Sequence, residues 1–248
     1  FRMAANPHKL VFVILDLLAS LLIRRLFSQV QVNGLDSFML TARDHPTVLV
    51  PVHRSHLDYI LLSSVLYRSW LNPPLVAAGD NLDFWPVGFF IRRTGAFFIK
   101  RSGKGSLIDA MVLKRYVAYL MKRGHLQEFF IEGGRSRSGR MLPPKVGILK
   151  TLVDAWERGV RREVQFVPVS ITYESIVEEK AFAKENTGEG KKKETFASLL
   201  GARKIFRSKY GEVVITFGAP VRASSFFGEL EVRKGNGKNG KERSGPVS

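Results

Sequence analysis

The stretch VPVHRSHLDY, residues 50–59, decides how the chain is expected to fold. The apolar run that leads into it predicts a strand over residues 47–52, and the residues after it predict a helix over residues 57–70. A strand that ends in a polar loop and continues as a helix is typical of an α/β fold, in which such loops carry the functional residues. We therefore expect the functional site in this loop.

Within the loop, His53 precedes Asp58 by five positions. Histidine exchanges protons near neutral pH, and an aspartate within reach can fix its tautomer and favour the charged imidazolium. The alternative interpretation is a capping pair, because Ser55 and Asp58 suit the first turn of a helix. Spacing alone leaves both interpretations open.

Strands alternate with helices along the chain, which predicts an α/β fold with a mostly parallel (mixed) central sheet flanked by helices. The expected strands are residues 47–52, 75–78, 96–99, 128–131, 165–172 and 212–217. The expected helices are residues 57–70, 84–93, 107–122, 146–158 and 195–209. Residues 32–46 are expected to form a turn-rich connection.

Residues 10–23, LVFVILDLLASLLI, are the most apolar part of the chain and predict an N-terminal helix. This stretch is short for a transmembrane helix, which needs about twenty residues. Asp16, Ser20, Arg24 and Ser28 recur at every fourth position and predict one narrow polar stripe on an apolar helix. Two interpretations stay open: a helix buried against the domain, or a helix inserted at a membrane interface.

Composition narrows the classes of partner and chemistry. The 39 Lys and Arg against 22 Asp and Glu give a formal net charge of +17, which indicates a polyanionic partner such as nucleic acid, anionic lipid or a phosphorylated substrate. The absence of cysteine excludes a disulfide framework, a thiolate nucleophile and a Cys-based zinc site.

The first residue is Phe1 rather than Met, so we expect the sequence to be part of a longer chain. We divide it into an N-terminal apolar helix (1–29), a central domain (30–223) and a basic low-complexity tail (224–248).

Basic residues follow two later strands. Lys100 and Arg101 come directly after the strand expected over residues 96–99, although a solvated strand end is an equally simple explanation.

Pro168 interrupts the strand expected over residues 165–172, which indicates a strand end or an edge, beside a ligand channel.

The loop EGGRSRSGR, residues 132–140, is more specific. Gly133 and Gly134 let the backbone turn sharply and approach a ligand closely. Arg135 and Arg137 supply planar groups suited to phosphate oxygens. The alternative is a flexible basic loop or a phosphorylation site around Ser136.

Several common catalytic signatures are missing from the sequence, including the GxSxG nucleophile elbow, the GxxxxGK[ST] phosphate loop and the HExxH zinc motif. A His–Asp pair without a Ser or Cys nucleophile indicates direct transfer, in which His53 deprotonates an acceptor hydroxyl that attacks a bound acyl group. The basic loops would then hold a phosphate on that acceptor. The residues give no reason to expect a metal.

Four blocks resemble, in order and separation, those of the glycerolipid acyltransferase superfamily: HRSHLD (53–58), GAFFIKR (95–101), FIEGGRSRSGR (130–140) and VPVSITYE (167–174). Within it, the chain looks most like the membrane-bound bacterial glycerol-3-phosphate 1-acyltransferases. The resemblance covers about residues 30–222, implies the fold of that superfamily and makes residues 30–223 the catalytic domain. The tail after Ala223 does not obviously follow the family.

The resemblance also implies roles for single residues. His53 would be the general base, and Asp58 would orient it. Six residues would bind the acceptor: Lys100, Arg101, Glu132, Gly133, Arg135 and Arg137. Pro168 would belong to the acyl-donor or catalytic environment. The implied reaction transfers a fatty acyl group from acyl-CoA or acyl-ACP (acyl carrier protein) to the sn-1 hydroxyl of glycerol-3-phosphate. It gives lysophosphatidic acid in the first step of phospholipid synthesis.

The resemblance implies no cofactor besides the acyl donor, no nucleic-acid partner, and a peripheral or monotopic place on the cytoplasmic face of the cell inner membrane, on its anionic surface. Dihydroxyacetone-phosphate acyltransferases tend to carry Thr where Gly134 stands, which favours glycerol-3-phosphate as the acceptor. The alternatives are acylation of dihydroxyacetone phosphate or lysophosphatidate, and a non-catalytic module that binds polyanions or lipid surfaces.

Overall fold

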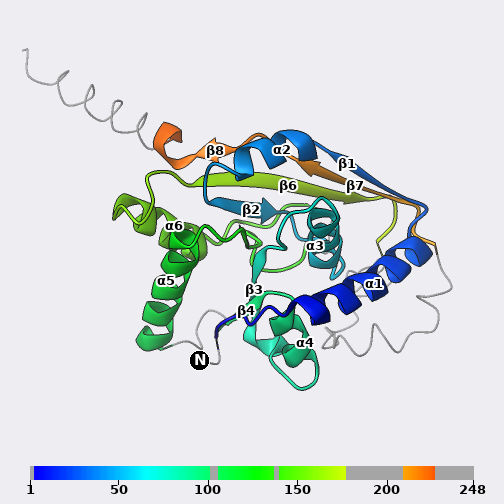
Figure 1. The fold of residues 1–248 in the computed structure, drawn as a ribbon, viewed down its shortest axis with the longest axis horizontal. Coiled ribbons are helices and arrows are strands. Elements are labelled where there is room, and N and C mark those ends of the chain that lie inside the picture. Colours follow the sequence, from blue (N-terminus) through cyan, green and yellow to red (C-terminus); the bar gives the residue numbers. More distant parts are fainter. Residues whose placement is uncertain (1–2, 101–105, 137–139, 177–208, 227–248) are drawn as a thin grey trace, which may run out of the picture.

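The computed structural model describes residues 3–100, 106–136, 140–176 and 209–226 (Figure 1). They contain one eight-stranded sheet in the order β1-β7-β6-β2-β5-β3-β4, with β8 paired to β6. The strands are β1 (Gln29–Asn33), β2 (Thr47–Pro51), β3 (Leu75–Gly79), β4 (Ala96–Ile99), β5 (Gln127–Glu128), β6 (Gln165–Tyr173), β7 (Glu212–Phe217) and β8 (Val221–Arg222). The helices are α1 (Lys9–Leu26), α2 (Leu35–Ala42), α3 (Asp58–Arg68), the 3-10 turn η1 (Asp80–Leu82), α4 (Val87–Arg93), α5 (Leu107–Lys122) and α6 (Gly147–Glu157).

The predicted mixed, mostly parallel sheet with flanking helices is confirmed. Neighbouring strands run parallel from β4 through β3, β5 and β2 to β6, and β1 runs parallel to β7. Strand β6 runs antiparallel to β7 and β8. Because β2, β3, β4, β5 and β6 point the same way, the loops that follow them emerge at one edge of the sheet.

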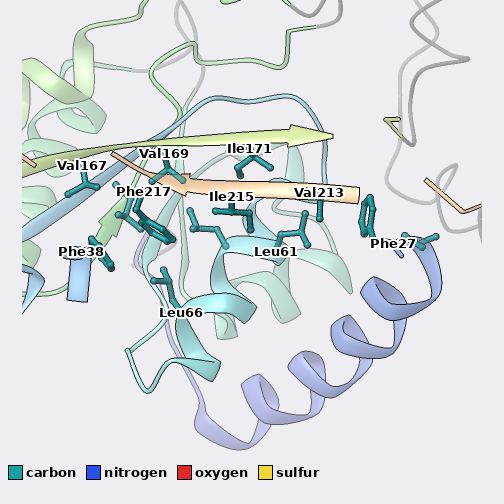
Figure 2. Packing of buried hydrophobic residues seen from close by; sticks show 13 residues of the cluster. Phe27, Phe38, Leu61, Leu66, Val167, Val169, Ile171, Val213, Ile215 and Phe217 are labelled. Atoms are coloured by element: carbon teal, nitrogen blue, oxygen red, sulfur yellow. The ribbon is translucent and has the colours of Figure 1, made fainter. Parts of the chain in front are cut away.

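Helices cover both faces of the sheet. Val48 and Leu49 of β2 point to opposite faces, as successive strand residues do, and belong to two separate buried clusters. The Leu49 cluster joins α1, α2 and α3 to β2, β6 and β7, and Figure 2 shows Leu61 and Leu66 of α3 facing the strand side chains. The Val48 cluster joins α5 and α6 to the other face. Helix α3, which follows the His53 loop, is thereby anchored by fully buried leucines.

The prediction of a turn-rich connection over residues 32–46 was wrong. Strand β1 ends there, and α2 follows it after Gly34, whose φ is 73°. A Cβ at Gly34 would lie 2.3 Å from the Phe217 carbonyl oxygen, so the close approach to β7 requires glycine. Strand β1 pairs with β7, and Asn33 lies opposite Thr216 in the register. A pairing between segments so far apart leaves no local signal in the sequence.

The position of Pro168 also differs from the prediction of a strand end or an edge. It lies inside the nine-residue β6, opposite Val50 of β2. On the other side, β8 pairs with β6 only up to Phe166 and β7 only from Val169, so Pro168 stands where that ladder is interrupted. Its carbonyl accepts from the Gly218 amide on this side, and proline has no N–H to return a second bond there.

The other elements follow the predicted pattern with shifted ends. The strand expected over residues 128–131 is only the short β5, and Phe129 then donates one more bond to Leu49. The helix expected over residues 195–209 and most of the tail expected over 224–248 lie outside the described residues. The division of the chain at residues 29/30 and 223/224 stays a prediction.

Two members of the predicted polar stripe of α1, Asp16 and Ser20, face the protein, whereas Arg24 is exposed and Ser28 lies beyond the end of the helix and is also exposed. Asp16 is buried, accepts from the Ser64 hydroxyl at 2.5 Å and lies 3.5 Å from the Arg68 guanidinium, both on α3. Ser20 accepts from Arg68 as well, so polar contacts hold α1 beside α3 (Figure 1). The opposite face of α1 exposes apolar side chains: Leu10, Val13, Ile14, Leu17, Leu18 and Leu21. Among the described helices, none combines the length and apolarity needed to cross a membrane.

Candidate active site

The loop between β2 and α3 brings His53 and Asp58 together at the edge of the sheet where the parallel strands end. His53 Nδ1 lies 2.9 Å from Asp58 Oδ2. Since a carboxylate only accepts hydrogen bonds, Nδ1 carries the proton of the neutral imidazole, and Nε2 is its basic nitrogen. The His53 side chain is 16% exposed and that of Asp58 is 0% exposed. The pair therefore has a buried acid and an imidazole that reaches the surface.

The Asp58 carboxylate is bound from two sides. Oδ2 also accepts the backbone N–H groups of Arg54 at 2.7 Å and Ser55 at 3.0 Å. Oδ1 accepts the hydroxyl of Tyr173, from the end of β6, at 2.6 Å. The two N–H groups belong to the loop before α3, so the carboxylate holds the loop rather than capping the helix. This geometry removes the capping alternative for Asp58, while Ser55 does accept from the Leu57 amide at 3.1 Å.

Two further contacts fix the His53 backbone and ring. The imidazole stacks on Phe130, with ring centroids 4.0 Å apart and planes inclined by 25°. The His53 carbonyl accepts from the Ser136 amide at 2.9 Å. Both partners belong to the loop that follows β5, which therefore lies directly against the β2–α3 loop.

Glu132 joins the same two loops. Its side chain is buried, and its two carboxylate oxygens accept from the backbone amides of His53 at 3.2 Å and Leu142 at 2.8 Å. In this structure Glu132 therefore braces the site, and its predicted role in binding the acceptor stays a prediction. Gly133 has φ of 60°, and a Cβ there would lie 2.6 Å from Lys145 Cδ. Gly134 has open space around it.

Glu128 is a second buried acid on the face that α3 covers. Its register partner on β2 is Leu49, whose cluster includes α3. Burial raises the pKa of Glu128 well above its usual range, and the nearby charge of Asp58 raises it further. Neither carboxyl oxygen of Glu128 has a hydrogen-bond partner among the described residues. Both causes favour the uncharged form of this carboxyl group near Asp58.

The predicted phosphate ligands are spread along one edge of the sheet. Arg135 is part-buried in the loop beside His53. Lys100 follows β4, three strands from β2, which corresponds to roughly 14 Å. Its ammonium pairs with Asp109 at 2.9 Å and is the main reason why the pKa of Asp109 is lowered to about 2. Arg101 and Arg137 lie outside the described residues.

The structure adds site residues that the sequence analysis did not single out: Phe130, Tyr173 and Glu128. Tyr173 lies within the fourth block, Phe130 is the first residue of the third, and Glu128 precedes the third by two positions, so their signal was membership in, or proximity to, blocks already noted. Pro168 of the fourth block is exposed on β6. Within the residues described, no three His, Cys, Asp or Glu side chains gather as a metal site would require.

Comparison with known proteins decides the family. A family model described as acyltransferase matches residues 29–172, which is more than half of the chain. The chain belongs to the acyltransferase family. The superfamily resemblance drawn from the four blocks is thereby confirmed. A second model, the glycerol-3-phosphate acyltransferase C-terminal region, matches residues 182–245 of this acyltransferase, including the tail for which no resemblance was noted.

Curated relatives carry the same description. The chain is 42% identical over 231 residues to a glycerol-3-phosphate acyltransferase of Xylella fastidiosa, covering 93% of this chain and 27% of the relative. It is 42% identical over 215 residues to that of Haemophilus ducreyi, covering 86% of this chain and 26% of the relative. The chain thus spans about a quarter of the length of these relatives.

Among solved structures, the chain is similar to the 1-acyl-sn-glycerophosphate (LPA) acyltransferase PlsC from Thermotoga maritima. The TM-score is 0.47 and the identity is 19%, and the match covers 88% of this chain and 74% of that one.

Proposed function

We propose that this acyltransferase transfers a fatty acyl group from acyl-CoA or acyl-ACP to the sn-1 hydroxyl of glycerol-3-phosphate. The observation that carries the proposal is the His53–Asp58 pair, in which the Nδ1–Asp58 contact leaves Nε2 as the base near the surface. The names of relatives at 42% identity support the choice of acceptor. The products are lysophosphatidic acid and a free thiol.

In the proposed reaction, Nε2 of His53 takes the proton of the sn-1 hydroxyl as its oxygen attacks the thioester carbonyl. The C–O bond forms, and the tetrahedral intermediate collapses with cleavage of the C–S bond. The imidazolium returns the proton to the leaving thiolate, so the imidazole is neutral again. Asp58 stabilises the transient positive charge through its contact with Nδ1.

Arg135 is the predicted acceptor ligand that lies in the loop beside His53. The amide of the next residue, Ser136, donates to the His53 carbonyl, so Arg135 lies in a loop that contacts the backbone of the base. A guanidinium binds phosphate oxygens in a planar, bidentate manner. Lys100, farther along the edge, would then meet a larger anionic group or the far side of the acceptor.

A competition among three acceptors tests the proposal. With one acyl-CoA and equal concentrations of glycerol-3-phosphate, dihydroxyacetone phosphate and lysophosphatidate, we expect the 1-acylated product of glycerol-3-phosphate to dominate. The measurement is product identity by mass spectrometry. Preference for either of the other acceptors, or indifference among them, would reject glycerol-3-phosphate as the acceptor, and salt-sensitive lipid binding without any turnover would reject catalysis.

Gly134 offers a variant for the same assay. The site has open space, so Gly134→Thr is expected to fold normally and to move the product ratio toward dihydroxyacetone phosphate. Gly134→Ala is the matched control, because it adds a Cβ without a hydroxyl. Gly133→Ala is expected to lower the melting temperature instead, since a positive φ and the Lys145 side chain oppose its Cβ.

We also propose that α1 and α4 rest on an anionic membrane surface. Leu17 and Leu21 of α1 are 58% and 66% exposed, on the face opposite to Asp16. Helix α4 adds Phe89 and Phe90, which are also exposed. Cations flank this apolar surface at the helix ends: Lys9, Arg24 and Arg25 on α1, and Arg92 and Arg93 on α4. Exposed apolar area bordered by cations is typical of helices that lie in the interface of an anionic bilayer.

Vesicle binding tests the surface. The double variant Leu17→Asp, Leu21→Asp is expected to weaken binding to vesicles of phosphatidylglycerol and phosphatidylethanolamine by more than about tenfold, since burying one leucine contributes about 1.5–3 kcal/mol. Leu40→Asp is the matched control, because Leu40 is 70% exposed but lies on α2. If flotation showed wild-type vesicle binding by the double variant, the proposal that this face binds the membrane would be rejected.

A further inference from the structure

Tyr173 reaches the catalytic pair from a different strand and from far along the chain. Its hydroxyl donates to Asp58 Oδ1 at 2.6 Å across 115 positions of sequence. Its ring lies against Phe27, with centroids 5.8 Å apart, where α1 ends. Phe27 belongs to the buried cluster of this face, and Tyr173 packs against that cluster. The hydroxyl is thus held in place by the packing of the ring behind it.

The two oxygens of Asp58 have different partners. Oδ2 accepts from the His53 ring and from the amides of Arg54 and Ser55, whereas Oδ1 accepts from Tyr173. A carboxylate bound through both oxygens cannot rotate about its Cβ–Cγ bond without breaking contacts. We propose that Tyr173 is a positioning residue, which holds the Asp58 carboxylate so that Oδ2 stays aligned with His53 Nδ1. The proposal rests on the proposed function only in its kinetic arm.

The hydroxyl also adjusts the charge that His53 meets. A hydrogen bond to a carboxylate withdraws negative charge from it and weakens its attraction for a protonated imidazole. Among the described residues, the titratable groups linked to Asp58 by a contact or by charge are His53 from the loop, Tyr173 from β6 and Glu128 from β5. Burial raises the pKa of Glu128, which favours its uncharged form, and its carboxyl oxygens make no hydrogen bond to Asp58 that could replace that of Tyr173. Removing the hydroxyl gives the Asp58 side chain more freedom to rotate, but the amides of Arg54 and Ser55 still bond Oδ2 and keep it near His53. The more concentrated negative charge on the carboxylate therefore sets the direction of the effect on His53.

Tyr173→Phe removes one oxygen and keeps the ring on Phe27. We expect kcat for acyl transfer to glycerol-3-phosphate to fall about tenfold to hundredfold, the range for losing a hydrogen bond to a charged group, with little change in KM. We also expect the acidic limb of the pH profile of kcat/KM to move to higher pH, because the imidazolium is held more strongly. Loss of packing alone would not move that limb. Tyr67→Phe is the matched control, since the Tyr67 ring packs at a tilted angle against Phe12 of α1 and has no contact with Asp58 among those of the described residues.

Site-specific 3-fluorotyrosine at Tyr173 gives the opposite test. The fluorine makes the phenol a stronger donor, so the acidic limb is expected to move to lower pH. The variant adds one atom and keeps the hydroxyl, so it remains informative if Tyr173→Phe proves unstable. Shifts of opposite sign in the two variants are not expected from a purely structural role.

An NMR titration of the His53 imidazole in each variant separates this proposal from the proposed function. If the wild-type chain does not acylate glycerol-3-phosphate, the proposed function fails, while the titration still measures the link from Tyr173 to His53. If the titration of His53 and the rate in Tyr173→Phe both match those of Tyr67→Phe, Tyr173 is not a positioning residue. Opposite shifts for the phenylalanine and fluorotyrosine variants support it.

Discussion

His53→Ala is expected to lower kcat for acyl transfer about 10²- to 10⁴-fold, the usual contribution of a general base. The substitution removes the Nε2 atom that would take the acceptor proton, while Glu132 and Ser136 bond to the backbone of residue 53 and can keep the loop in place. Binding of glycerol-3-phosphate is therefore expected to change little. The measurements are release of free thiol from acyl-CoA and calorimetric binding of glycerol-3-phosphate.

His125→Ala is the matched control for the loss of an imidazole. His125 is exposed after α5, its backbone amide donates to the Leu120 carbonyl, and its imidazole has no hydrogen-bond partner among the described residues. We expect this variant to retain the wild-type rate. Near-normal acyl transfer by His53→Ala would instead show that the base is another group, and the mechanism would have to be abandoned.

Asp58→Asn is expected to produce the second large loss, again about 10²- to 10⁴-fold in kcat, because it removes the charge that stabilises the imidazolium. The amide fits the same space. Its oxygen can accept from the donors on the Oδ2 side, and its NH₂ group can donate to the Tyr173 hydroxyl, which both donates and accepts. We therefore expect a much smaller loss of stability than for Asp58→Ala. Alanine leaves those buried donors unpaired, at a cost of about 3–5 kcal/mol.

Asp16→Asn separates the loss of a buried charge from the loss of catalysis. Asp16 is also buried. It lies on α1, accepts a hydrogen bond from Ser64 and pairs with Arg68, both on α3. It is expected to change the melting temperature and to leave kcat near the wild-type value. If Asp58→Asn behaved like Asp16→Asn in both measurements, Asp58 would have a structural role alone.

Residue patterns predicted the core of the fold and the centre of the site because both depend on local order. The alternation of apolar strands with amphipathic helices implies parallel strands, and parallel strands place the loops that follow them at one edge. His53 and Asp58 are five positions apart on either side of a strand–helix loop, so proximity followed from the sequence. The loop of residues 132–140 was predicted from its Gly and Arg residues to bind a phosphate, and its described part lies against the His53 loop.

Contacts between distant segments required the tertiary structure. Tyr173 meets Asp58 only because β6 lies next to β2, and the sequence does not specify that neighbour. Strand β1 was missed because its partner, β7, lies near the other end of the chain. Glu132, identified by its motif, turned out to bond both of its oxygens to backbone amides.

The polar stripe of α1 combines the two cases. The sequence by itself determined that Asp16 and Ser20 share one face of an apolar helix, because the spacing of four residues is a property of the helix. Only the tertiary structure decided that this face turns inward, since Ser64 and Arg68 of α3 supply the partners that a buried carboxylate requires. Strand order and helix packing determine such partners, and the periodicity of one segment does not predict them.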